Sequence, residues 1–130
     1  MHDLPLIAEW QRATHRLLAA LDDELADLGL SAAETNVLAC FAGTDACAVR
    51  DLVTATGQRP STLTGVLDRL ERRALIERAP HPDDRRSVLV HLTGPGRAAA
   101  EQVAAAFATV EARLPAAAMR PILRAIAAPH

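Results

Sequence analysis

Apolar side chains recur at helical spacing over much of the chain. The first such stretch covers residues 4–28 and ends at Gly29. A period near 3.6 residues predicts an amphipathic helix, with its apolar positions at Ile7, Trp10, Leu17, Leu18, Leu21, Leu25 and Leu28. Ser31 and Glu34 have the spacing of a capping box, which marks the start of a helix. A second helix is therefore expected up to Gly43, with Val37, Leu38 and Phe41 on its buried side.

Two further helical patterns follow closely. Residues 49–56 fit a short helix that stops at Gly57, and another begins near Pro60, a residue favoured in a first helical turn. The apolar positions of this fourth helix have i, i+3, i+4, i+7 spacing; they are Leu63, Val66, Leu67 and Leu70. Its other side begins with small polar residues and continues with arginines: Ser61, Thr62, Thr64, Asp68, Arg69 and Arg72.

The period changes from 3.6 to two after the fourth helix. LIERA (75–79) is a strand candidate, and SVLVHLT (87–93) alternates between two sets of side chains. The two segments predict a β-hairpin with a seven-residue tip from Pro80 to Arg86. This tip, PHPDDRR, contains two adjacent arginines.

Helical spacing returns in the last third of the chain. Thr93 is expected to cap a long alanine-rich helix with Pro95 just inside its start, and Pro115 to end it. Its apolar stripe is Val103, Phe107, Val110 and Leu114, and a final short helix carries Met119, Ile122, Leu123 and Ile126. The predicted fold is a single, mainly α domain of 130 residues with a small β-hairpin.

The order of elements between residues 49 and 93 is helix, turn, helix and charged hairpin. This is the organisation of a winged helix-turn-helix. The major groove of DNA accepts a helix whose short polar side chains approach base edges. A hairpin tip is thin enough to lie along the minor groove, where an inserted arginine meets a strong negative potential.

The segment GQRPSTLTGVLDRLERRALIERAPHPDDRRSVLVHLTGPGR (57–97) resembles the DNA-binding core of MarR-type (multiple-antibiotic-resistance regulator) transcription factors. The matching features are PSTLT at the start of the recognition helix, the DRLE segment, and an Asp-x-Arg wing tip before a strand ending in LT. The resemblance covers residues 31–97 and rests on helix placement alone outside them. It implies a winged core at 31–94, and dimerisation helices at 1–28 and 95–130 that interlock in a homodimer.

The resemblance also assigns roles to individual residues. Pro60, Ser61, Thr62 and Thr64 would face the major groove, with Arg59 adding to the basic face. Arg69 and Arg72 would hold phosphate or brace the wing. Asp84 and Arg86 match the Asp-x-Arg pair, in which the arginine enters the minor groove and the aspartate orients it. Arg85 would then contact the DNA backbone.

Plainer interpretations of the same residues remain open. Arg69 and Arg72 could pair with Asp68 or Glu71 on a solvated helix face, and residues 83–86 could form an ordinary surface turn. One departure from the family is Ala74, which stands where the recognition helix usually ends in glycine. In a left-handed conformation, alanine costs about 1 kcal/mol relative to glycine.

Charge is distributed unevenly along the chain. The formal net charge is −2, and residues 1–49 hold two arginines against eight acidic residues. Residues 50–97 reverse this balance, with nine arginines against six acidic residues. A basic segment in an otherwise acidic chain favours a polyanionic partner for that segment.

Other kinds of site find little support. Cys40 and Cys47 do not form a CxxC pair, and the histidines at 2, 15, 81, 91 and 130 lack metal-ligand spacing, so no metal or cofactor is expected. No glycine-rich phosphate loop or catalytic constellation indicates an enzyme. No apolar run approaches the ~20 residues of a membrane span. Acidic residues occupy the start of the chain, where a signal peptide would be positive, and a cytoplasmic protein is expected.

These observations predict a sequence-specific transcriptional regulator. We expect a homodimeric repressor that binds a pseudo-palindromic operator and is released by a small lipophilic or phenolic effector. One alternative is a winged helix kept for dimerisation or protein interaction without DNA binding. Another is a redox-sensing regulator that uses Cys47, which lies in the loop segment TDACAV.

Overall fold

The computed structural model describes residues 3–129, so His2 and His130 lie outside the described residues. It is mostly helical with one small sheet, which confirms the predicted fold class. The elements, in chain order, are α1 (Leu6–Leu25), a short 3-10 helix (Ala26–Leu28), α2 (Ala32–Ala39), β1 (Ala46–Ala48), α3 (Val49–Thr56), α4 (Pro60–Arg72), β2 (Ile76–His81), β3 (Asp84–Leu92), α5 (Gly94–Glu111) and α6 (Ala116–Ala127).

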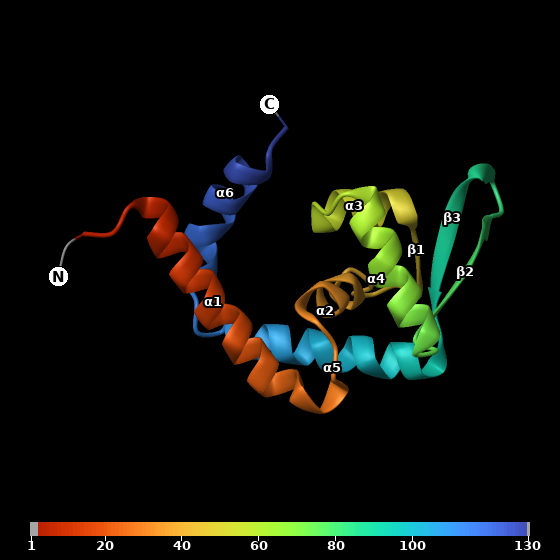
Figure 1. The fold of residues 1–130 in the computed structure, drawn as a ribbon, viewed down its shortest axis with the longest axis horizontal. Helices are drawn as coiled ribbons and strands as arrows, with labels where there is room; N and C mark the ends of the chain where they lie inside the picture. Colours follow the sequence, from red (N-terminus) through yellow and green to blue (C-terminus); the bar gives the residue numbers. More distant parts are fainter. Residues whose placement is uncertain (1–2, 130) are drawn as a thin grey trace.

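The chain divides into two regions joined by α5 (Figure 1). α3, α4 and the β-hairpin stand at one end, while α1 and α6 stand at the other. α5 packs against both α1 and α2, so it connects the two regions. The sheet is antiparallel with the order β1-β3-β2, and the hairpin formed by β2 and β3 projects from the body.

The core lies beneath α4 and the base of the hairpin. All four apolar positions predicted for α4 are buried, with relative exposures of 0% to 2%. They pack with residues from the other elements of the winged core and from α5; examples are Leu38, Leu52, Ile76, Val90 and Val103. The predicted helical period of α4 is therefore confirmed by burial.

Two predicted helix caps are present with their expected hydrogen bonds. The Ser31 hydroxyl accepts from the backbone N–H of Glu34, whose carboxylate accepts from the backbone N–H of Ser31. Thr93 caps α5, because its hydroxyl accepts from the backbone N–H of Gly96. These caps set where α2 and α5 begin.

The junction between α4 and the hairpin is held tightly against the start of α5. Ala74 has a φ of +58°, the left-handed conformation anticipated from its position. The Thr93 hydroxyl donates to the Ala74 carbonyl at 2.6 Å. A Cβ on Gly96 would lie 1.8 Å from the carbonyl oxygen of Leu75, so this position accepts only glycine without backbone movement.

The predicted hairpin tip was too long. β2 continues through Pro80 and His81, and β3 begins at Asp84, which leaves a two-residue turn instead of seven. Pro80 is tolerated because β2 is an edge strand, where a missing backbone donor leaves no ladder bond unmade. The register shifts beside it, and residues 85–87 have no paired position on β2.

Two other features differ from the expected pattern. The three-residue strand β1, which pairs with β3 at Ala46–His91 to Ala48–Leu89, was not predicted, because three residues show no period. The apolar stripe of α1 is exposed at Ile7 and Trp10 and half-buried at Leu17 and Leu21, and among the residues of α1 only Leu25 is buried. α6 has no buried residue at all within this described chain.

Candidate nucleic-acid interface

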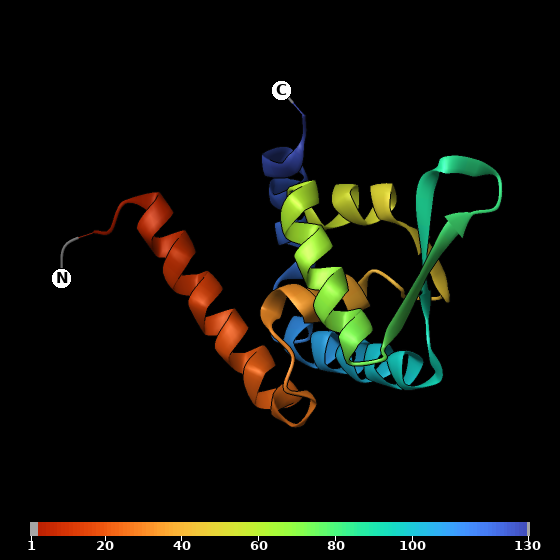
Figure 2. The same ribbon diagram turned by 45° about the vertical axis from the view of Figure 1, so that its right-hand side comes forward.

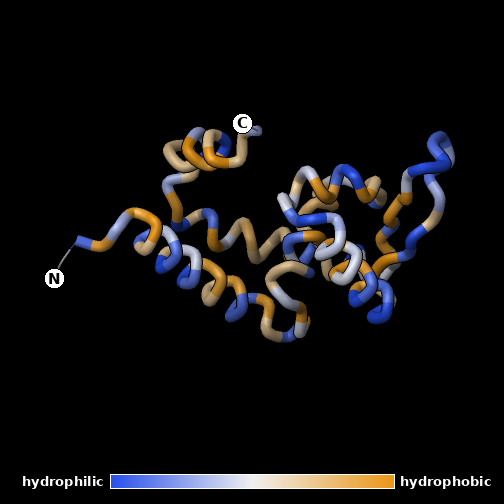
Figure 3. The backbone as a smooth tube through the Cα atoms, turned by 45° about the horizontal axis from the view of Figure 1, so that its top comes forward, coloured by the Kyte–Doolittle hydropathy of each residue, from blue (hydrophilic) through white to orange (hydrophobic). Residues whose placement is uncertain are grey.

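The N-terminal end of α4 and the hairpin tip lie on the same side of the molecule. Both views of the ribbon place the start of α4 and the β2–β3 turn at the upper side (Figures 1 and 2). The hydrophilic colour of the tip in Figure 3 distinguishes it from the base of the hairpin. The structure thus brings together two segments that the sequence separates by about one helix and one strand.

The first turn of α4 offers small, exposed polar groups. Arg59 is the N-cap residue, Pro60 is the first helical residue, and no side chain caps the helix. The side chains of Ser61 and Thr62 are exposed and make no hydrogen bond within residues 3–129. Thr64 is also exposed, and its hydroxyl donates to the Pro60 carbonyl at 2.9 Å. The uncapped N–H groups and the helix dipole favour a negatively charged group here.

Arg85 and Arg86 occupy the unpaired bulge next to the turn. Both are exposed, and within the described chain neither they nor Arg59 forms an ion pair. Their guanidinium groups therefore have free donors, five on each arginine, with which to contact phosphates or base edges.

Asp84 organises the backbone of this bulge. Its carboxylate accepts from the backbone N–H of Arg86 at 3.0 Å and from the hydroxyl of Ser87 at 3.0 Å. These two hydrogen bonds, with a smaller contribution from nearby Arg50, lower the pKa of Asp84. Asp84 thus positions the main chain of Arg86 and leaves its guanidinium free.

A second interaction of Asp84 joins the tip to α3. The Arg50 guanidinium lies 3.4 Å from the Asp84 carboxylate, across 34 residues of sequence. Arg50 was not predicted, and no local pattern marks it. Both side chains are exposed, so this ion pair contributes little to the stability of the fold. Its main effect is to restrain the direction of the hairpin tip relative to α3.

The base of the hairpin is braced by an arginine that was also not predicted. Arg78 of β2 donates to Asp68 at 2.6 Å and to Glu71 at 3.0 Å, both on α4. Its hydrogen bonds lower the pKa of Glu71, and the two carboxylates raise the pKa of Arg78. Two acidic residues three positions apart on α4 were the available sequence signal for such a cation.

Arg69 and Arg72 lie farther along α4 than the polar first turn. Arg69 is 3.6 Å from the buried carboxylate of Glu34, and Arg72 donates to the Asp68 carbonyl at 3.4 Å. Both remain largely exposed. In the free protein the carboxylates of Asp68 and Glu71 pair with Arg78, not with these two arginines.

Arg73, just past the end of α4, ties this helix to the end of the 3-10 helix that follows α1. Its guanidinium donates to the carbonyls of Leu28 and Gly29 at 2.7 and 2.9 Å. Sequence analysis did not single out this residue. It fixes the C-terminal end of the candidate recognition helix, opposite the end that carries the polar groups.

An exposed apolar surface covers α1 and α6. Seven large apolar side chains of these helices and of the residues just before α1 are at least 40% exposed: Leu4, Leu6, Ile7, Trp10, Ile122, Leu123 and Ile126. Orange segments along both helices in Figure 3 mark their apolar residues. Exposed apolar patches of this extent mark interaction surfaces.

A cavity of about 470 Å³ lies between α1, α2 and α5. Its walls are apolar residues together with uncharged polar ones: Thr14, Leu17, Leu18, Leu21, Ala32, Ala33, Thr35, Asn36, Gln58 and Phe107. It therefore borders both the winged core and the helices at the other end of the molecule.

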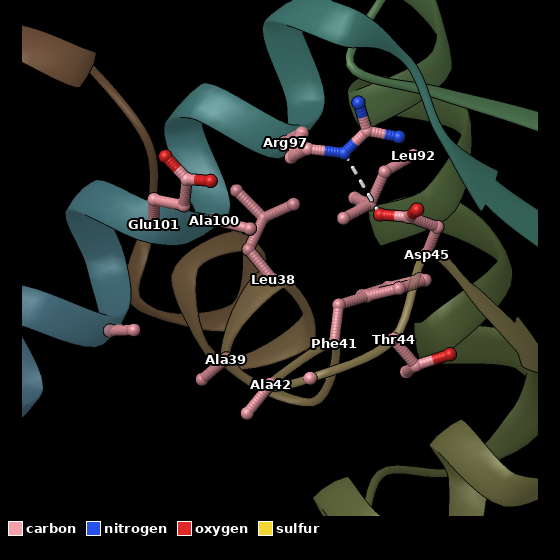
Figure 4. A pocket seen from close by; sticks show the side chains of 12 residues that line it. Leu38, Ala39, Phe41, Ala42, Thr44, Asp45, Leu92, Arg97, Ala100 and Glu101 are labelled. Atoms are coloured by element: carbon pink, nitrogen blue, oxygen red, sulfur yellow. Dashed lines mark hydrogen bonds and ion pairs between the residues drawn. The ribbon is translucent and has the colours of Figure 1, made fainter.

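A smaller pocket of about 250 Å³ lies between α5 and the loop after α2 (Figure 4). Its floor is apolar, and its rim carries an ion pair in which the Arg97 guanidinium donates to Asp45 at 2.9 Å. This hydrogen bond lowers the pKa of Asp45 and raises that of Arg97. The pair links the loop before β1 to α5.

The cysteines are poorly suited to redox chemistry. Cys47 is half-buried on β1, and its thiol lies 3.7 Å from the Cys40 carbonyl. Burial raises the pKa of both thiols, and Asp51 raises that of Cys47 further. A raised pKa reduces the thiolate that reacts with oxidants.

Within residues 3–129, no group of three potential metal ligands is close enough to hold an ion. The helices of this part of the chain also lack the combination of length and hydropathy that a membrane span needs.

Comparison with known proteins identifies relatives of this chain. The MarR family model matches residues 30–88. The repressor NicR of Pseudomonas putida is 40% identical over 60 residues, which cover 40% of this chain and 38% of NicR. The chain spans 57% of the curated protein MarR of Escherichia coli, and so covers less than two thirds of these curated relatives.

Solved structures match over nearly the whole chain. BpsR of Bordetella bronchiseptica, whose DNA binding is regulated by 6-hydroxynicotinic acid, has a TM-score of 0.81 and 31% identity, covering 97% of this chain and 95% of BpsR. A Cys-to-Ser mutant of E. coli MarR complexed with operator DNA has a TM-score of 0.77 and 27% identity, covering 95% and 94%. The fold, the arrangement of the wing and these matches together establish that the chain belongs to the MarR family.

Proposed function

We propose that this protein is a homodimeric, sequence-specific DNA-binding transcriptional regulator that acts in the cytoplasm. The observation that carries the proposal is the common orientation of the polar start of α4 and the arginine-bearing wing tip. The E. coli MarR structure with operator DNA supports DNA as the partner.

α4 is the proposed recognition helix. Its N-terminal end enters the major groove, where Ser61, Thr62 and Thr64 approach base edges beside Pro60. Arg59 contacts phosphate at the groove edge. Arg69 and Arg72 reach the flanking backbone by exchanging their present partners for phosphates.

The wing supplies the second contact. Arg86 enters the minor groove, where the negative potential is greatest, and Arg85 contacts the adjacent backbone. Asp84 acts indirectly, since its hydrogen bonds hold the bulge from which both arginines project. The hairpin keeps a fixed direction relative to α4 through Arg78.

The exposed apolar surface of α1 and α6 is the proposed dimer interface. Residues 1–28 and 95–130 form the dimerisation region, and residues 31–94 form the DNA-binding core. A two-fold dimer presents two recognition helices about one helical turn of DNA apart, which calls for a pseudo-palindromic operator. An operator next to a promoter blocks polymerase, so the proposed role is repression.

A small lipophilic or phenolic effector is proposed to release the DNA. The cavity between α1, α2 and α5 supports this, because it borders both the DNA-binding core and the dimerisation helices. BpsR, whose DNA binding is regulated by 6-hydroxynicotinic acid, supports the same mode of control. Differential binding to two dimer shapes typically supplies ~1–3 kcal/mol of coupling.

The first test is a DNA titration at two salt concentrations, using DNA from upstream of the protein's own gene and random DNA of equal length. Tighter binding to the upstream fragment, with affinity falling steeply as salt rises, is expected because arginines neutralise several phosphates per dimer. Weak and equal binding to the two DNA fragments would indicate that the operator lies elsewhere, and the operator would then be sought by selection from random sequences.

Two outcomes would contradict DNA binding as the function. A flat salt dependence is inconsistent with arginine-to-phosphate contacts. No binding even at low salt would favour the alternative of a winged helix kept for protein interaction. The redox alternative receives no support from the raised pKa values of the two thiols.

A further inference from the structure

His81 lies at the tip of the hairpin, where its side chain supports the turn. It is the last residue of β2, and only Pro82 and Asp83 separate it from the first residue of β3. The backbone N–H of Asp83 donates to the ring nitrogen Nδ1 of His81 at 3.1 Å. A side chain that accepts from the backbone two residues further on is a common way to hold a tight turn.

The same hydrogen bond determines which ring nitrogen of His81 carries a proton. Because Nδ1 accepts, it is unprotonated, and the neutral ring holds its N–H on the other nitrogen, Nε2. Within residues 3–129, Nε2 makes no hydrogen bond and is not among the buried polar atoms that lack a partner, so it is open to solvent. His81 therefore presents one accessible donor, and the turn restrains the ring that carries it.

Between residues 80 and 83, His81 has the one side chain that can donate. Pro80 and Pro82 have no polar side-chain group, and the carboxylate of Asp83 only accepts. On β3, by contrast, two adjacent arginines carry donors. A partner rich in acceptors would therefore meet the arginines on one strand of the hairpin and His81 on the other.

The minor groove of DNA is bordered by acceptors on both sides. It is about 6 Å wide in B-DNA, and a phosphate backbone runs along each of its edges. The proposed function puts Arg86 in this groove and Arg85 against one of the two backbones. The other strand of the hairpin, β2, then faces the second backbone, whose phosphate oxygens accept hydrogen bonds from protein side chains.

We propose that His81 contacts DNA directly, and that its Nε2–H donates to a phosphate oxygen of the strand across the minor groove from the strand that Arg85 contacts. The inference rests on the proposed function and adds a contact residue on β2. The two ring nitrogens of His81 then have separate tasks, since Nδ1 holds the turn and Nε2 binds the phosphate. Contacts with both backbones keep Arg86 centred in the groove.

Two variants of the full chain separate a DNA contact from a purely structural role in the turn. His81→Asn keeps a side-chain acceptor for the Asp83 N–H, because asparagine forms the same kind of turn, but its side chain is too short to reach beyond it. His81→Ala removes both functions. Each variant is expected to bind the operator, found by the titration or selection described above, about fivefold more weakly than the wild type, the usual effect of one hydrogen bond. Binding by His81→Asn at wild-type strength would overturn the proposal, since the histidine would then serve the turn alone.

Amide hydrogen exchange at Asp83 reports whether the turn is intact. Exchange should be as slow in His81→Asn as in the wild type and faster in His81→Ala. His91→Asn makes the same chemical change at a half-buried position nearer the base of the hairpin and should keep the operator affinity within about twofold. An equal loss of affinity in His91→Asn would contradict a specific role of His81.

Substitutions in the DNA identify the atom that His81 contacts, and they decide the matter even if the turn loosens in His81→Asn. In synthetic operators, single phosphates along the groove that the wing enters are replaced in turn by neutral methylphosphonates. One position in each half-site should weaken the wild type by about fivefold but His81→Asn by less than about twofold, because the variant has already lost that contact. The corresponding position for Arg85→Ala should lie on the opposite strand. If His81→Asn responded to every substitution as the wild type does, or if both positions lay on one strand, the proposed contact would be wrong.

Operator binding by the wild type separates this inference from the proposed function. If the wild-type protein binds no DNA, the proposed function fails and the role of His81 fails with it. If the wild type binds the operator and Arg86→Ala weakens that binding, but His81→Asn does not, only the role of His81 fails.

Discussion

The two ends of the molecule are exposed in different ways. The proposed DNA-binding end presents free arginines and hydroxyl groups, whereas α1 and α6 present large apolar side chains such as Leu6, Ile7 and Ile126, which are 76%, 67% and 64% exposed. Charged groups are well solvated when no partner is bound, but an apolar surface of this extent is not. The difference supports our proposal of a partner that binds reversibly at one end and of a permanent partner at the other.

Disruption of the apolar end is expected to have the largest effect. Ile7→Asp puts a carboxylate on the exposed stripe of α1 and should convert the dimer into monomers, as measured by sedimentation. DNA affinity should fall by roughly 100-fold or more, because linkage of two half-sites multiplies affinity by ~10²–10⁴.

The matched control for this change lies at the other end. Val88→Asp also places a carboxylate at an exposed apolar position, on β3, where Val88 is 41% exposed. It should leave the protein dimeric. If Ile7→Asp remained a dimer, or if both variants dissociated, the contrast between the two ends would be wrong.

Loss of Arg86 in the wing is expected to have the next largest effect on DNA affinity. Arg86→Ala should weaken DNA binding by about tenfold, within the ~1–3 kcal/mol range of a specific arginine contact. Sedimentation should show an unchanged dimer. Arg12→Ala on α1 removes the same charge far from the wing and should change affinity by less than about twofold; similar losses for both variants would refute the assignment of Arg86.

Changes at Asp84 should act through the geometry of the wing. Asp84→Ala removes the acceptor for the Arg86 backbone N–H and the Ser87 hydroxyl, together with the ion pair to Arg50, and DNA affinity is expected to fall by about fivefold. Amide hydrogen exchange at Arg86 should become faster. Asp84→Asn retains a carbonyl acceptor and should give an intermediate result, whereas an Asn variant as weak as the Ala variant would point to the charge instead.

The pH dependence of this contact follows from the lowered pKa of Asp84. Its folded-state pKa lies below the ordinary value of 3.8, because the ionised form accepts the hydrogen bonds of the bulge. The contribution of Asp84 to wing stability is therefore fully present above that ordinary value. It is lost as the pH falls through the lowered pKa of the folded protein.

The smallest effect is expected at the junction between α4 and the hairpin. Ala74→Gly relieves a left-handed alanine and should raise the free energy of unfolding by about 1 kcal/mol, measured by denaturant titration. Ala55→Gly, inside α3, makes the same chemical change at a helical position and should lower it by a similar amount. Stabilisation by both, or by neither, would show that φ at residue 74 does not govern the effect.

Features that depend on near neighbours were predictable from the sequence. The capping box at Ser31 and the buried positions of α4 involve residues at most a few positions apart, so their spacing alone revealed them. The left-handed conformation of Ala74 was anticipated from the resemblance instead, since glycine usually ends the recognition helix in that family. The roles assigned to Ser61, Thr62 and the wing arginines remain predictions.

Features that depend on distant segments were not predictable. β1 exists because β3 pairs with it, and three residues such as Ala46–Ala48 have no period of their own. The Arg50–Asp84 and Arg73–Leu28 contacts join residues 34 and 45 positions apart, so no local pattern marks either partner. The hairpin tip is shorter than predicted, because β2 continues through Pro80, which an edge strand tolerates, and β3 begins at Asp84.

The contacts of Arg73 anchor the C-terminal end of α4. They fasten its C-terminal end to the turn after α1, while its N-terminal end carries no side-chain cap. With a rise of 1.5 Å per residue, the free end lies about 18 Å from the fastened one. A rotation of α4 by only about 5° about the Arg73 contacts would therefore displace its N-terminal end by about 1.6 Å, which is about half the length of a hydrogen bond. A displacement of this size would misplace the groups that we propose to contact base edges.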